Sequence, residues 1–159
     1  MTKIAFLLTF AHFLCFSQVI FCQSDYVDEE EVEEACKPKP INKKINKLLQ
    51  NAKDRGKSYK EQTKLLREAL EKDEQCGSCL WEIAKKNFIK AKVEGGEYFD
   101  HAIKYYRRLI DVCPHWHADV YYNLGIVYYN KTNDEMAKKY FELFLDFPTD
   151  NVNKLGRNY

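Results

Sequence analysis

Apolar residues recur at helical spacing over residues 118–148, in two runs separated by a short polar stretch. In the first run, positions i, i+3, i+4 and i+7 share one face of a helix: Tyr121, Leu124, Gly125 and Tyr128. A second helix has a similar inner face: Ala137, Tyr140, Phe141 and Phe144. Residues 132–134 favour a turn and an N-cap, and Pro148 would end the second helix. The pattern predicts a helical hairpin, in which the small Gly125 and Ala137 allow the two backbones to approach closely.

Two further hairpins are predicted upstream, so residues 41–148 are expected to form an all-α fold of six helices. In the first hairpin, the second helix begins after Ser58, and Glu61 stands at the spacing of a capping pair. In the second hairpin, a helix over residues 80–93 precedes a glycine-containing turn at residues 94–97 and its partner helix. No heptad pattern continues across the turns, so a coiled coil is not expected.

The order of these residues resembles the tetratricopeptide repeat, a helix–turn–helix unit of about 34 residues. The likeness rests on aromatic-x-x-Leu-Gly-x-x-Tyr, then Ala-x-x-x-Phe, then Pro, and it is clearest in the last hairpin. It extends over three repeats, at residues 41–74, 79–114 and 118–148, and implies a right-handed superhelix. The first helix of the middle repeat is longer than is usual in the family, and Gln62 stands where alanine is usual. An ordinary helical bundle is the alternative interpretation of the same apolar faces.

The resemblance also implies a binding surface, because in this family the first helices of successive repeats line a concave groove. Mapped position by position, the groove would contain ten residues: Asn46, Gln50, Lys53, Glu82, Lys86, Ile89, Asp119, Tyr122, Ile126 and Tyr129. Asp119 and Asn123 stand where the family's chaperone-tail receptors have the lysine and arginine that hold a terminal carboxylate, so that specificity is not expected. The groove suits an extended peptide or a helix of a protein partner, although some tyrosines could instead pack against a neighbouring repeat.

The N-terminal residues predict export. Lys3 precedes an uncharged apolar run that gives way to polar residues, which is the layout of a signal peptide over residues 1–22. Cleavage is expected after Ser17 or after Cys22. An uncleaved membrane anchor is the alternative, because residues 4–22 are just long enough to span a bilayer.

Residues 23–40 are expected to form a solvated linker before the repeats, and residues 149–159 a tail after them. Seven of the ten residues 25–34 are acidic, and none is basic. The chain from Cys36 onward has a modest excess of basic residues, spread too evenly to indicate nucleic-acid binding. The tail is too short for the polar capping helix that such arrays usually need, so a partner or a missing downstream segment is expected to cap the last repeat.

Four cysteines follow the predicted signal peptide, and export favours disulfides: Cys36, Cys76, Cys79 and Cys113. The start and end of a helical hairpin lie side by side, so the pairs Cys36–Cys76 and Cys79–Cys113 would each close one hairpin. A local Cys76–Cys79 bridge is the alternative. A thioredoxin-type redox pair would need a strand that the sequence does not offer, and a zinc site would need a second Cys-x-x-Cys motif.

No sequence motif of catalysis is present: there is no phosphate loop, nucleophile elbow or His-x-x-x-His helix. We therefore expect a protein that is not an enzyme and has no cofactor or metal. Signal peptide, cysteine and repeats together resemble the N-terminal part of bacterial envelope proteins with β-propeller and OmpA-like domains, some of which serve type IX secretion or gliding. That resemblance implies a periplasmic or outer-membrane-associated adaptor for a protein partner. The alternatives are a structural subunit of an envelope complex and, more distantly, a redox or zinc protein.

Overall fold

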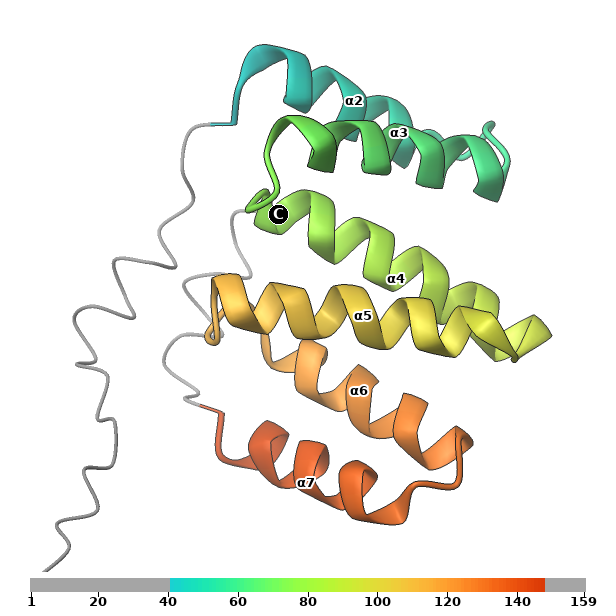
Figure 1. Cartoon of the computed structure of the whole chain (residues 1–159), viewed down its shortest axis with the longest axis vertical. Coiled ribbons are helices and arrows are strands. Elements are labelled where there is room, and N and C mark those ends of the chain that lie inside the picture. The colour runs from blue at the N-terminus through green and yellow to red at the C-terminus, as the bar shows by residue number, and fades with distance from the viewer. Residues whose placement is uncertain (1–40, 148–159) are drawn as a thin grey trace, which may run out of the picture.

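The computed structural model describes residues 41–147, which form six α-helices and no strand. The helices pair into three hairpins that stack one after another (Figure 1). Their bounds, in chain order, are α2 Lys43–Lys53, α3 Tyr59–Lys72, α4 Gly77–Glu94, α5 Glu97–Val112, α6 Ala118–Asn130 and α7 Asp134–Leu145. The all-α arrangement of helical hairpins expected from the sequence is confirmed. The predicted signal peptide, the linker and the tail lie outside the described residues.

Capping groups explain where several helices begin. Before α3, the Ser58 side chain accepts a hydrogen bond from the Glu61 backbone N–H, and the Glu61 carboxylate accepts one from the Ser58 N–H. This reciprocal capping box is the one that the sequence predicts. Asn133 caps α7, within the polar stretch expected to hold a turn. Between α4 and α5, Gly95 and Gly96 adopt φ angles of 66° and 59°, a left-handed conformation that favours glycine.

Helix α4 begins at Gly77, three residues earlier than the apolar pattern indicates, and its N-cap is Cys76. A β-carbon added to Gly77 would lie 2.4 Å from Cζ3 of the Trp116 ring, so the glycine lets the indole cover the first turn of the helix. Trp116 is itself buried in the connection between α5 and α6. The first turn of α4 is therefore part of the junction between the second and third hairpins.

Each hairpin contributes buried side chains to one continuous core. Tyr106 on α5 is fully buried, packs its ring near Trp81 and Phe88 of α4, and accepts a hydrogen bond from the Asn123 side chain of α6 at 3.0 Å. This one residue thus contacts both hairpins of the junction. Burial of the phenol raises the pKa of Tyr106, so the side chain stays neutral and can pack in the core.

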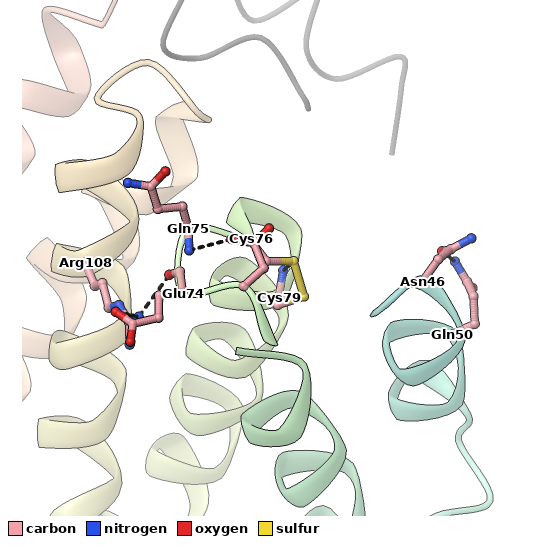
Figure 2. Close-up of a disulfide and its surroundings, with 8 residues drawn as sticks. Asn46, Gln50, Glu74, Gln75, Cys76, Cys79 and Arg108 are labelled. Atoms are coloured by element: carbon pink, nitrogen blue, oxygen red, sulfur yellow. Dashed lines mark hydrogen bonds and ion pairs between the residues drawn. A yellow bond between two sulfur atoms is a disulfide. The ribbon is translucent and has the colours of Figure 1, made fainter. Parts of the chain in front are cut away.

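The structure pairs Cys76 with Cys79, and the two Cα atoms are 5.2 Å apart (Figure 2). Our favoured pairs Cys36–Cys76 and Cys79–Cys113 are therefore wrong, and the local bridge is the one observed. The reason is local geometry: the N-cap and the third residue of a helix already lie within disulfide distance. Cys113 also takes part in a disulfide, and Cys36 lies outside the described residues.

The disulfide pairing has a direct test by peptide mapping. Trypsin cuts after Lys72 and Lys85, which leaves Cys76 and Cys79 together in one peptide with no other cysteine. Without reductant, we expect mass spectrometry to find this peptide alone and lighter by two hydrogens than after reduction. Its recovery joined to the peptide that contains Cys113 would contradict the structure. A reduced sample of the same digest is the control.

Candidate functional site

An open hollow of about 400 Å³ lies between the first and second hairpins. Its walls come from the end of α2, the loop before α3, the first turn of α3 and the middle of α4. Eight residues line it: Lys53, Arg55, Lys57, Gln62, Glu82, Lys85, Lys86 and Ile89. Because α2 and α4 are the first helices of successive hairpins, the hollow lies on the side where the sequence predicts a groove. We call it the α2–α4 hollow.

The lining of the α2–α4 hollow is strongly basic, with five cations and a single acid. The acid, Glu82, lies 3.7 Å from Lys53 and can offset only part of this charge. Lys57 pairs with Asp54 in the loop before α3 at 2.6 Å. In residues 41–147, Arg55 and Lys85 form no ion pair, and both are exposed. The hollow therefore presents positive charge that the described residues do not neutralise.

Gln62 holds one of the cations in place. Its side-chain oxygen accepts a hydrogen bond from the Lys86 Nζ at 2.9 Å, and its nitrogen donates one to the Asp54 carbonyl at 2.6 Å. Partial burial lowers the pKa of Lys86. Gln62 is the residue at which the first repeat departs from the family pattern, and the larger side chain here links α3 to the lining of the hollow.

The hollow also has an apolar contact surface. Ile89 of α4 is among the lining residues and is 54% exposed. A ligand with carboxylates and an occasional apolar side chain would match this combination. A neutral or basic ligand would leave the cations without partners.

The structure places only part of the predicted groove at this hollow. Glu82 and Lys86, and the nearby Lys53 and Ile89, line it. Asn46 and Gln50 are exposed one turn apart on α2, where the Gln50 amide donates to Asn46 at 3.4 Å (Figure 2). They belong to the same helix as Lys53 but do not line the hollow.

The predicted groove residues of α6 lie in a different setting. The Tyr122 ring is 6.0 Å from Phe141 and 5.3 Å from Phe144, both on α7, so this tyrosine packs within its own hairpin. Ile126 is half-buried and Tyr129 is 64% exposed. Asp119 is exposed at the start of α6, with a carboxylate oxygen 3.5 Å from His117 Nδ1. These four residues do not join the cations of the α2–α4 hollow.

Sequence reasoning missed three cations that the fold adds to the site: Arg55, Lys57 and Lys85. Arg55 and Lys57 belong to the loop between α2 and α3, and Lys85 precedes the predicted Lys86. The signal was present in the basic character of that loop and in the Lys85-Lys86 pair. The family's groove positions do not include this loop or Lys85, so mapping by those positions alone misses these cations.

The described part of the chain shows neither a metal-binding cluster nor a membrane-spanning helix. Across residues 41–147, no group of three or more His, Cys, Asp or Glu side chains could hold a metal ion. None of the six helices is both long and apolar enough to cross a membrane.

In a comparison with protein families, residues 118–150 match the tetratricopeptide repeat. These residues include α6 and α7, the hairpin in which the motif is clearest in the sequence. The match supports a tetratricopeptide repeat in the last hairpin, and repeats of this kind generally mediate protein–protein interaction. No curated protein matches the chain.

Proposed function

We propose that this chain is a non-enzymatic adaptor of the bacterial cell envelope that binds an acidic segment of a protein partner in the α2–α4 hollow. The observation that carries the proposal is the hollow itself, with five cations, one acid and an exposed isoleucine between two stacked hairpins. Tetratricopeptide repeats bind peptides on the side formed by their first helices, which agrees with the position of this hollow. Positive charge favours an acidic partner because it speeds encounter and excludes basic competitors.

The proposed location rests on the N-terminal sequence and on cysteine chemistry. An apolar run after Lys3 is typical of export, and a disulfide such as Cys76–Cys79 persists in an oxidising compartment. The resemblance to envelope proteins with OmpA-like domains adds type IX secretion or gliding as the proposed setting. Within it, the chain would dock one envelope component onto another.

The charge of the hollow gives the proposal its test. Replacing Arg55 and Lys85 with glutamate should reduce recovery of the native partner at least about tenfold in crosslinked affinity purification from the envelope, because several charge contacts reverse together. Both residues are exposed, so we expect little change in stability. The matched control replaces Lys104 and Arg107, exposed residues of α5, with glutamate.

Two results would contradict the proposal. Equal recovery with the hollow variant and the α5 variant would show that the hollow does not bind the partner. Recovery of no stable partner with the wild-type chain would count against an adaptor altogether.

A structural subunit of a larger envelope complex is the second candidate, and the last hairpin favours it. Leu143 and Leu145 of α7 are 39% and 77% exposed, and Tyr129 of α6 is 64% exposed. A contiguous apolar patch on a surface marks an interaction site, and a subunit interface on this hairpin would bring these side chains into one. If this function is the correct one, Leu145→Ser should release the chain from its native complex while the hollow variant remains bound.

A further inference from the structure

Two features of opposite charge belong to the same chain. Residues 25–34 contain seven acids and no base, and the α2–α4 hollow contains five cations and one acid. We propose that residues 25–34 bind intramolecularly in the α2–α4 hollow and mask it until a partner displaces them. This inference rests on the proposed function, because it describes the regulation of the same binding site.

The chain is long enough for this contact. Lys43, at the start of α2, lies nine residue steps after Glu34, and an extended chain advances about 3.3 Å per step, or roughly 30 Å in all. Helix α2 has 11 residues and is therefore about 16 Å long. Residues 25–34 can thus turn back along α2 and reach Lys53 and Arg55 at its far end.

The chemistry of the two surfaces also matches. Arg55 and Lys85 form no ion pair within residues 41–147 and are available to carboxylates. Val32 lies among the acids and could contact the exposed Ile89. Carboxylates with a few apolar side chains among them match the cations and the exposed Ile89 of the hollow.

Another basic surface is less suitable for the same segment. On the outer face of α5, Lys104, Arg107 and Arg108 lie between Asp100 and Asp111. The acids there offset much of the positive charge and would repel a run of carboxylates. The α2–α4 hollow has one acid against five cations and offers the stronger attraction.

A contact of this kind is weak enough to be displaced. Exposed ion pairs contribute little individually and are screened by salt. The short connection to α2 offsets the weakness of the individual ion pairs, because a tethered segment has an effective concentration on the order of millimolar at its site. A free partner must compete with that concentration, so the masked site binds only a partner that offers further contacts.

The experiment measures binding of a labelled synthetic peptide of residues 25–34 to the purified chain by fluorescence anisotropy. Two forms of the chain are compared: the wild type, and a variant in which all seven acids of residues 25–34 are replaced by their amides. We expect the amide variant to bind the peptide about tenfold more tightly than the wild type, because its hollow is unmasked. Added salt should weaken binding to the amide variant.

Two further variants, built on the amide variant, define where the peptide binds. Arg55→Glu with Lys85→Glu should abolish peptide binding, whereas Lys104→Glu with Arg107→Glu on α5 should leave it unchanged. Helical circular dichroism verifies that each variant is folded. An equal loss in the α5 variant would overturn the inference, because it would indicate attraction to overall charge.

The inference is also overturned if the amide variant does not bind the peptide, or if the wild type and the amide variant bind it equally. Neither result depends on the native partner. The proposed function is judged by recovery of that partner from the envelope, so the two can fail separately. If the two forms bind the peptide equally but the hollow variant loses the partner, the intramolecular contact is refuted and the adaptor function still stands.

Discussion

Gly125→Leu is expected to destabilise the last hairpin by at least about 2 kcal/mol, which is in the range for overpacking a close contact. A β-carbon at this position would lie 2.6 Å from ring carbons of Phe141, nearer than such atoms can approach. The leucine would therefore force α6 and α7 apart. Urea unfolding followed by circular dichroism should show a lower midpoint.

Two companion variants test whether this contact is the cause. Lys138→Leu adds the same side chain at a highly exposed position of α7 and should change stability by no more than about 0.5 kcal/mol. Phe141→Leu in a Gly125→Ala background should recover part of the loss caused by Gly125→Ala alone, because the two sites are in contact. A Gly125→Leu protein with an unchanged midpoint would contradict the close approach of the two helices.

Tyr106→Ala is expected to cost about 3–5 kcal/mol, the usual effect of truncating a buried aromatic side chain. The ring packs near Trp81 and Phe88, and its hydroxyl accepts a hydrogen bond from Asn123. Its loss would leave a cavity at the junction between the second and third hairpins. Urea unfolding should give a lower midpoint and a broader transition, because the repeats would no longer unfold together.

The hydroxyl and the ring of Tyr106 can be separated experimentally. Tyr106→Phe keeps the ring and should cost about 1 kcal/mol, since it removes only the hydrogen bond from Asn123. Tyr129→Ala serves as the exposed control on α6 and should cost no more than about 0.5 kcal/mol. If Tyr106→Ala were no more destabilising than Tyr129→Ala, the proposed junction would be wrong.

The helices could be predicted because their signals are local. Apolar spacing gives the buried face of each helix, and residues such as Ser58, Glu61 and Asn133 mark where helices begin. The early start of α4 could not be predicted in this way, because Cys76 and Gly77 are not typical of a helix start. Gly77 is explained by Trp116, a contact between residues far apart in the sequence.

The favoured disulfide pairs are wrong because they follow from the proximity of hairpin ends and ignore the spacing within a single helix. Cys76 and Cys79 stand on the N-cap and third residue of one helix, where the backbone alone brings their Cα atoms to 5.2 Å. The favoured pairs would have required bridges between separate elements. Had the helix been predicted to start at Gly77, the local pair would have been the first choice.

The candidate site was predicted in part. Glu82 and Lys86 follow from helix positions that repeat along the chain, and both line the hollow. Arg55 belongs to a loop, whose conformation has no periodic signal in the sequence. Tyr122 was assigned to the groove by its position; in the structure its ring packs near Phe141 and Phe144 of its own hairpin, and the residue is 44% exposed.

Site-specific photocrosslinking in the native envelope would decide whether the α2–α4 hollow is the binding surface. A photoreactive amino acid replaces Lys85 in the hollow or, as the matched control, Lys104 on the outer face of α5. We predict that residue 85 crosslinks to another protein and that residue 104 does not. Crosslinking of a partner from residue 104 with none from residue 85 would place the binding surface elsewhere and contradict the adaptor function proposed for the hollow.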